Sequence, residues 1–382
     1  MSGWRHAVAA DTVFDGAAVH RDMAVVIESD RIAALLPRRD VPAGVPVRDV
    51  PAGIWLAPGF IDIQVNGGGD VLFNDTPSPE GIAAIAAAHR RFGTTALLPT
   101  LISAAPETMR AAGAAAAALV GVHPGILGIH YEGPFLSPDR PGVHDPAAIR
   151  RPGPGDFALL TSLRRGVTVV TLAPEQAGTG FVAALAGAGV KVSLGHSAAN
   201  YDETRAALAA GLTGFTHLFN AMPPLLSRAP GPIAAALEEP GAYYGLIADG
   251  VHVAPAMLRL ALRGLGQAML VTDAMPPVGG AASEFIVCGK RVAVQDGRCT
   301  TADGTLAGSA LDMAGAVRNC VRLLGLSLPA ALHLAGAAPA RFLGLADRLG
   351  RLAPGYRADM VALDPVEIRV LASWVAGEAD ED

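Results

Sequence analysis

The stretch PGFIDIQVNGG, residues 58–68, begins the most regular part of the sequence. It is a short apolar run that ends in polar residues and a glycine pair, as a buried strand does where its carboxyl end meets a loop. Seven similar runs follow, separated by Ala-rich helical stretches, so that parallel strands are expected. The eight candidate strands are 59–66, 94–100, 126–132, 167–173, 190–196, 214–220, 243–249 and 268–274. Eight such units predict an α/β fold, a closed (β/α)8 TIM-type barrel.

The two ends of the chain have another pattern, with short β-like runs broken by turns such as Ser29-Asp30. We therefore predict a small β-sandwich domain built from both chain ends, residues 1–57 and 350–382, and a barrel from 58 to 349. A doubly wound open sheet is the alternative for the barrel. Polar residues end most of the candidate strands, whereas an open sheet would gather them at one switch point, and this favours the barrel.

Composition limits the function classes. Of 382 residues 51% are hydrophobic and 17% are charged, which indicates a large core rather than a disordered chain. A net charge of −6 argues against nucleic-acid and acidic-membrane partners. Three cysteines without a CxxC pair are typical of a reducing compartment. We find no signal peptide and no apolar run long enough to span a membrane. A cytoplasmic protein is the expectation.

Four of the ionisable residues at the ends of candidate strands stand out. They are Glu132, His196, His217 and Asp273, on the third, fifth, sixth and eighth strands. Singly, a histidine here would more often be a hydrogen-bonded core group, and an aspartate could cap a helix. Together they share the carboxyl-end face of the barrel, where such folds carry their chemistry. One carboxylate and two imidazoles, Glu132, His196 and His217, form a set that binds catalytic zinc and leaves a place for water.

We expect one divalent metal per subunit, with Zn²⁺ the first choice and Fe²⁺ or another divalent ion open. Gln64 and Asn66 end the first strand, where a second metal would need imidazoles. Their neutral carboxamides bind a dication weakly. They are expected to line the substrate site, where they hydrogen-bond water or fill the vacated space. His130 shares the strand face of Glu132 but lies deeper, and we interpret it as a residue that either supports a metal ligand or packs in the core.

The sequence resembles the amidohydrolase superfamily and, within it, the family of N-acetylglucosamine-6-phosphate deacetylases, over about residues 11–377. The segments that carry the resemblance are PGFIDIQVNGG, TTALLPTLIS, HYEGPFLSPDRPGVHDP, LGHSAANYDE, GFTHLFNAMPPLLSRAPG, YYGLIADGVHV, LVTDAMPPVG and GTLAGSALDM. The resemblance implies hydrolysis of N-acetyl-D-glucosamine 6-phosphate to D-glucosamine 6-phosphate and acetate. Gln-x-Asn on the first strand matches the members that hold one metal.

The resemblance also implies residue roles. Glu132, His196 and His217 become the metal ligands, Asp273 the catalytic acid/base, and His144 the group that orients or polarises the N-acetyl carbonyl. The substrate contacts it implies are Asn220, the backbone N–H of Ala221, Arg228 and His252. In this family the arginine reaches the phosphate from the partner subunit, so a homodimer is expected. The Pro-rich setting of that arginine, PPLLSRAPG, departs from relatives and leaves the fit of the sugar open.

Two other functions stay open. A related amidohydrolase could act on another N-acyl amino sugar or on an N-acyl amino acid. Two-metal members of such groups usually need a bridging lysine, and the only lysines are Lys191, at the start of a candidate strand, and Lys290. A non-catalytic scaffold would agree with the missing His-x-His. The four retained ionisable residues argue against it.

Overall fold

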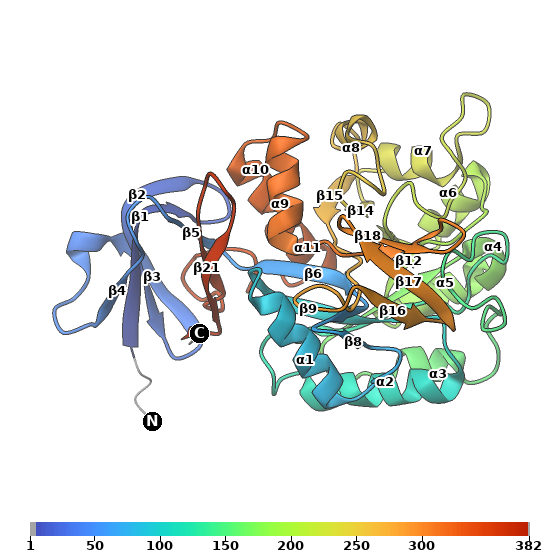
Figure 1. Ribbon diagram of the computed structural model, residues 1–382, viewed down its shortest axis with the longest axis horizontal. Coiled ribbons are helices and arrows are strands. Elements are labelled where there is room, and N and C mark those ends of the chain that lie inside the picture. The colour runs from blue at the N-terminus through green and yellow to red at the C-terminus, as the bar shows by residue number, and fades with distance from the viewer. Residues whose placement is uncertain (1–4, 381–382) are drawn as a thin grey trace. The chain divides into compact units, whose positions relative to one another are not determined.

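The computed structural model describes residues 5–380, and one of its two eight-stranded sheets is parallel (Figure 1). The eight strands of this sheet are β6 (Phe60–Val65), β9 (Thr94–Ile102), β10 (Gly128–Glu132), β11 (Val167–Leu172), β12 (Lys191–Leu194), β13 (Gly214–Phe215), β14 (Tyr243–Leu246) and β15 (Gln267–Leu270). They follow one another in chain order from β6 to β15. A parallel bridge between Val65 and Ala274 joins the first strand to the segment after the last. The predicted (β/α)8 barrel is confirmed.

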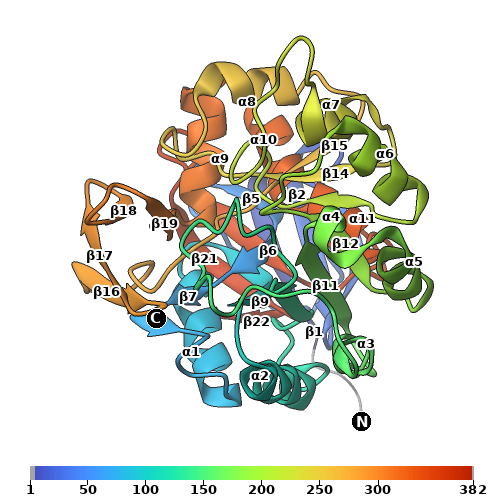
Figure 2. The ribbon, with the colours of Figure 1, turned by 90° about the vertical axis from the view of Figure 1, so that its right-hand side faces the viewer.

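Helical segments follow the barrel strands and surround them in Figure 2. They are α1 (Pro79–Arg90), α2 (Pro106–Leu119), α3 (Asp156–Leu160), α4 (Pro174–Ala177), α5 (Thr179–Gly187), α6 (Tyr201–Ala209), α7 (Gly231–Glu238) and α8 (Pro255–Ala261). The local sequence explains where several of these helices begin. Proline lies in the first turn of α2, α4 and α8, where its missing N–H costs nothing. Asn200 and Glu203 form a capping box at α6.

Several barrel strands end earlier than predicted. β12 ends at Leu194 and β13 at Phe215, so His196 and His217 lie in the loops that follow. Asp273 likewise lies beyond β15. All three have a positive φ, of 48°, 32° and 53°, which is outside the extended region of backbone conformation. These three side chains are therefore carried by sharp turns directly after the strands.

A second, mainly antiparallel sheet joins both ends of the chain. Its strands are β1 (Arg5–Phe14), β2 (Val19–Glu28), β3 (Arg31–Pro37), β4 (Val47–Asp49), β5 (Trp55–Pro58), β20 (Met360–Leu363), β21 (Val370–Val375) and β22 (Glu378–Ala379). β20 from the C-terminal part pairs with β5 from the N-terminal part. Along β1, Val8 and Ala10 pack in one apolar cluster and Ala7 and Ala9 in another. Both faces are thus buried, as the prediction of a sandwich from both chain ends requires.

The chain divides into two compact units. The first contains residues 5–62, His89–Ala96 and residues 312–380, including α9 (Met313–Arg322), α10 (Leu328–Ala335) and α11 (Ala337–Leu343). The second contains Ile63–Ala88 and Leu97–Leu311. The domain boundaries after residues 57 and 349 stay a prediction. In the described residues, 5–380, we find no helix with the length and apolar character to cross a membrane.

A four-stranded antiparallel sheet lies in the second unit and was not predicted. Its strands are β16 (Glu284–Val287), β17 (Lys290–Gln295), β18 (Arg298–Thr301) and β19 (Leu306–Ser309). The smaller pair β7 (Gly67–Gly68) and β8 (Val71–Leu72) lies near the end of β6. Val287, Val292 and Cys299 of the four-stranded sheet pack with Met275, which follows β15. The sheet is therefore anchored to the segment that carries Asp273.

Candidate functional site

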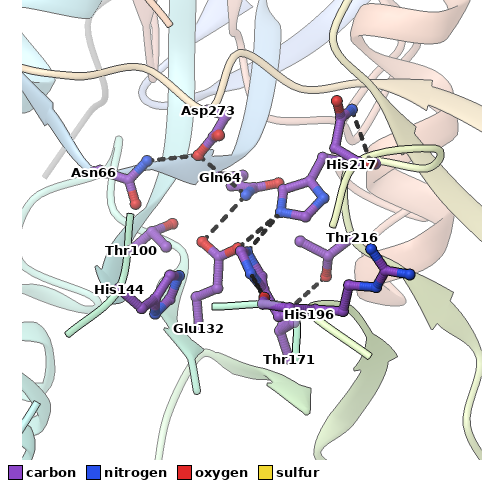
Figure 3. A network of polar contacts seen from close by, with 12 residues as sticks. Gln64, Asn66, Thr100, Glu132, His144, Thr171, His196, Thr216, His217 and Asp273 are labelled. Atoms are coloured by element: carbon purple, nitrogen blue, oxygen red, sulfur yellow. Dashed lines mark hydrogen bonds and ion pairs between the residues drawn. The ribbon is translucent and has the colours of Figure 1, made fainter. Parts of the chain in front are cut away.

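Three buried side chains converge at the carboxyl ends of the barrel strands (Figure 3). Oε1 of Glu132 lies 3.1 Å from Nε2 of His196 and 3.0 Å from Nε2 of His217. The two Nε2 atoms are 3.1 Å apart. Within residues 5–380 this is the group of three or more ionisable side chains whose geometry could hold a metal ion. The three residues expected to bind a metal are therefore brought together.

The tautomer of His196 follows from its second ring nitrogen. Nδ1 lies 2.9 Å from the carbonyl oxygen of Arg140, and a carbonyl only accepts, so Nδ1 carries the proton. In the neutral ring Nε2 is then a bare lone pair that faces the oxygen of Glu132. The Ser137 N–H donates to the carbonyl of His196 at 2.8 Å. The loop from Ser137 to Arg140 thus holds both the backbone and the imidazole of His196, and a hydrogen bond of this kind orients a histidine that could bind a metal.

The electrostatics of the cluster favour positive charge. Burial opposes ionisation of Glu132, yet the adjacent imidazoles of His196 and His217 hold the pKa of this carboxyl well below its usual range. Burial likewise disfavours the imidazolium of His217, but the adjacent Glu132 raises its pKa. The carboxylate oxygen and the two imidazole nitrogens lie about 3 Å apart. When their lone pairs face one another, these atoms repel unless a cation lies among them. One carboxylate oxygen and two imidazole nitrogens suit Zn²⁺, Fe²⁺ or a similar divalent ion.

Asp273 lies beside the cluster and is held by two carboxamides. Its Oδ1 accepts from Nδ2 of Asn66 at 2.6 Å and from Nε2 of Gln64 at 3.1 Å. Nε2 of Gln64 also donates to Oε2 of Glu132 at 3.2 Å. Gln64 and Asn66 therefore present N–H donors to both carboxylates, and an N–H donor cannot bind a cation. Oδ2 of Asp273 is the oxygen that these contacts leave for proton transfer.

The pKa of Asp273 is raised to about 6. Burial is the largest cause, and the negative charge of Glu132 adds to it. The hydrogen bond from Asn66 acts in the opposite direction. A carboxyl with a pKa near neutrality can accept a proton and return it in one reaction cycle, which is what general acid–base catalysis needs.

His144 presents an N–H to the same cavity. Its Nδ1 accepts from the backbone N–H of Ser103 at 3.2 Å and lies 2.8 Å from the Ser103 hydroxyl. Because a backbone N–H only donates, Nδ1 is unprotonated and Nε2 carries the hydrogen. Burial lowers the pKa of His144 to about 3, so the ring is neutral at pH 7. Its ring centroid is 4.4 Å from that of His196. His144 is thus a neutral hydrogen-bond donor next to the metal ligands.

One cavity of about 340 Å³, within the usual range for small-molecule sites, is lined by Asn66, Glu132, His144, His196, His217 and Asp273. Gln64, which was expected to line the substrate site, is not among its lining residues. The expected contacts Asn220, Ala221 and His252 also line it. Asn220 Nδ2 donates to the carbonyl of His217 at 3.1 Å, and Ala221 has a φ of 50° in the same turn. His252 Nδ1 lies 2.6 Å from Oδ2 of Asp249, which fixes the ring. The structure brings these three expected contacts to the site.

Arg228 lies elsewhere. It is exposed, it is not among the residues that line the cavity, and it sits in a tight turn closed by Leu226 and Ala229. Leu226 is 55% exposed and Leu225 is 37% exposed in the same loop. Within one chain this arginine does not join the other expected substrate contacts.

Several residues that line the cavity were not predicted from the sequence. They are Ile102, Asp139, Arg140, Pro141, Gly142, Val143, Ile247, Met275, Thr305, Leu306 and Gly308. Ser103, which sets the tautomer of His144, was also missed. One signal was available: Gly142 directly precedes the segment VHDP, and its φ is 56°. A Cβ at Gly142 would lie 3.0 Å from Cε1 of His196, so the positive φ and this close approach both favour glycine beside the candidate metal cluster.

Comparison with known proteins adds to this geometry. The model of the Amidohydrolase family matches residues 55–381. An N-acetylgalactosamine-6-phosphate deacetylase of Shewanella sp. (strain ANA-3) is 44% identical over 326 residues, 85% of this chain and 82% of the relative. The crystal structure of N-acetylglucosamine-6-phosphate deacetylase from Pasteurella multocida has a TM-score of 0.95 at 34% identity, covering 99% of this chain and 100% of that one. A Mycobacterium smegmatis variant enzyme in complex with N-acetyl-D-glucosamine-6-phosphate has a TM-score of 0.91 at 37% identity, covering 99% of both chains.

Proposed function

The chain belongs to the amidohydrolase family, and from this premise we propose that it removes the acetyl group from N-acetyl-D-glucosamine 6-phosphate. The products are D-glucosamine 6-phosphate and acetate. The observation that carries the proposal is the cluster of Glu132, His196 and His217 with Asp273 beside it in one cavity. A complex of a 37% identical relative with this phosphosugar supports the choice of substrate.

Glu132, His196 and His217 would hold one divalent cation, with Zn²⁺ as the first choice. Such a cation, when bound, lowers the pKa of water towards neutrality and polarises a carbonyl oxygen. Gln64 and Asn66 direct N–H groups at both carboxylates, which supports one cation per subunit rather than two. The residues that bind it are all buried, so the charge acts in a medium of low dielectric constant.

Asp273 acts as the general base and then as the general acid. With Oδ1 occupied by Asn66 and Gln64, Oδ2 takes the proton from the attacking water. It then gives a proton to the departing amine, since an amine leaves poorly unless it is protonated. The pKa of about 6 suits both transfers near pH 7.

His144 donates through Nε2–H to the acetyl oxygen as negative charge develops there. The Ser103 contacts keep the ring in this tautomer. Because the pKa of His144 is lowered to about 3, the donor is a neutral imidazole rather than an imidazolium. One such donor is typically responsible for about 10²- to 10³-fold in rate.

The phosphate binds at the opposite end of the sugar. Asn220, the Ala221 N–H and His252 contribute from one chain, and Arg228 reaches in from the partner of a homodimer. The exposed loop with Leu225, Leu226 and Arg228 supports this arrangement, because such apolar side chains favour a protein interface.

The three cysteines are free, in keeping with a cytoplasmic location.

A second substrate has specific support. The relative at 44% identity is named for N-acetylgalactosamine 6-phosphate, which differs from the first substrate in the configuration of one hydroxyl group. The same acetamide chemistry and the same phosphate contacts serve both sugars. Acetate release from the two sugars is therefore measured side by side, and the larger kcat/KM value identifies the preferred substrate.

The deciding experiment measures acetate release from both phosphosugars, from unphosphorylated N-acetylglucosamine and from an N-acyl amino acid. We expect fast release from a phosphosugar, loss of activity with a chelator, and recovery with a divalent metal. Elemental analysis is expected to give one equivalent per chain. Preference for the N-acyl amino acid would overturn the proposed substrate class, and a metal-free, inactive protein would support a scaffold.

A further inference from the structure

The structure assigns to Arg140 a role that rests on the proposed function: we propose that its guanidinium binds the phosphate of the substrate within the same chain. Arg140 belongs to the loop that follows β10, and it lines the cavity that holds the metal ligands. Among the described residues that line this cavity it is the one arginine or lysine side chain. Acidic side chains are more numerous in the lining, with Glu132, Asp139 and Asp273.

The side chain of Arg140 has no partner in the described part of the chain. Its Nε is buried and makes no hydrogen bond. Other partly buried arginines are paired, since Arg150 contacts Asp156 and Arg357 contacts Asp359 through short ion pairs. A buried polar group without a partner is costly, and at a cavity wall a ligand is the group that would satisfy it.

The backbone of Arg140 is fixed on both sides. Its N–H donates to the carbonyl of Ser137 at 3.0 Å, and its carbonyl accepts from Nδ1 of His196 at 2.9 Å. The guanidinium is therefore tied through its own main chain to a metal ligand. Binding a remote anionic group at this point would position the rest of the substrate relative to the metal ligands.

The charges at the cavity also favour a phosphate as the ligand of Arg140. Glu132 and Asp273 contribute two negative charges to the cavity, which a divalent cation balances. A phosphate dianion then needs a further cation. Arg228 lies outside this cavity within its own chain, so Arg140 is the cation available in cis. A guanidinium can bind phosphate through two parallel hydrogen bonds, which a lysine cannot reproduce.

The test compares Arg140→Gln with Arg140→Lys and with a control, Arg164→Gln, which removes an exposed arginine outside the cavity. Each metal-loaded protein is assayed with N-acetylglucosamine 6-phosphate and with unphosphorylated N-acetylglucosamine. We expect Arg140→Gln to raise KM for the phosphosugar by about 10- to 100-fold, the usual size of a lost hydrogen bond to a charged group, with metal content unchanged. The unphosphorylated sugar keeps its KM, Arg140→Lys is intermediate, and the control is unchanged.

An equal effect on both sugars, or no effect on either, would overturn the inference. A second measurement does not depend on turnover: calorimetric binding of D-glucose 6-phosphate is expected to weaken by the same factor in Arg140→Gln. Unchanged binding would also overturn it. The proposed function fails separately, if the unmodified protein releases no acetate from the phosphosugar. The glucose 6-phosphate measurement still tests Arg140 in that case.

Discussion

At the residue scale, Asp273 is the side chain on which the proposed chemistry depends. Asn66 and Gln64 hold one of its oxygens, so replacement by asparagine keeps an acceptor for both amides and removes only the proton-accepting oxygen. We expect Asp273→Asn to lower kcat by about 10²- to 10⁴-fold while metal content stays normal. Acetate release and elemental analysis measure the two quantities. Asp139→Asn, an exposed carboxyl at the same cavity, is the matched control, and a near-normal rate in Asp273→Asn would remove the general base.

The raised pKa of Asp273 also predicts a pH profile. Asp273 acts as a base only when it is ionised. The value of kcat/KM is therefore highest above the pKa of Asp273 and decreases as the pH falls through about 6. A bound cation moves this acid limb of the pH profile to lower pH, because a nearby positive charge lowers the pKa of a carboxyl. The Asn66 hydrogen bond favours the ionised form, so Asn66→Ala raises the pKa and moves the limb to higher pH, by about one unit. Profiles of the two metal-loaded proteins measure the shift, and coincident acid limbs would contradict it.

The residue types at the site were predictable, but their hydrogen bonding was not. Glu132, His196 and His217 were expected at one face because parallel strands end together, and they lie about 3 Å apart. The tautomer of His144 depends on Ser103, which lies 41 residues away along the chain. No periodicity links two such residues, since their contact arises only when two strands and their loops fold together.

At the element scale, the structure differs from the prediction mainly in where the barrel strands end and in the presence of the small sheet β16–β19. The candidate strands included His196 and His217, but β12 and β13 end before these residues, which themselves have a positive φ. The sheet β16–β19 had a usable signal in Cys288-Gly289 and Asp296-Gly297, whose four positive φ values are typical of tight hairpin turns. Its role at the cavity could not be predicted, because it depends on tertiary pairing of Ser309 with Ala274.

That pairing predicts a test of the small sheet. Gly308 in β19 has a φ of 59°, and a Cβ there would lie 2.8 Å from the carbonyl oxygen of Asp273 and 2.6 Å from Cγ of Met275. We expect Gly308→Ala to displace Asp273 and lower kcat by about 10- to 100-fold with metal content retained. Gly304→Ala is the control, since its φ of 83° is equally unfavourable but a Cβ there meets nothing within 4 Å. Equal kcat values for the two variants would contradict the positioning role.

At the scale of the whole molecule, the barrel was predictable because eight strand–helix units repeat along the chain. Its closure was not, since it depends on the Val65–Ala274 bridge and on the N–H groups of Asn66 and Gly67, which both donate to the Ala274 carbonyl at 2.9 Å. Closure brings the first and last strands together, and so it places Gln64 and Asn66 against Asp273. The proposed single-metal arrangement is in this sense a consequence of barrel closure.

The exposed loop of Arg228 predicts complementation between subunits. In a dimer of Asp273→Asn and Arg228→Gln chains, one site has its own Asp273 and an intact arginine from the partner, whereas the other has neither. Random mixing of equal amounts makes half of the dimers mixed, so about a quarter of the sites become normal if each dimer is symmetric. We expect this fraction of the unmodified activity at low substrate, where Arg228→Gln alone is weak because phosphate binding is lost. Mixtures are refolded together and assayed against the sum of the separate variants. If Arg228 acts within its own chain, no mixed site is complete, and activity stays at that sum.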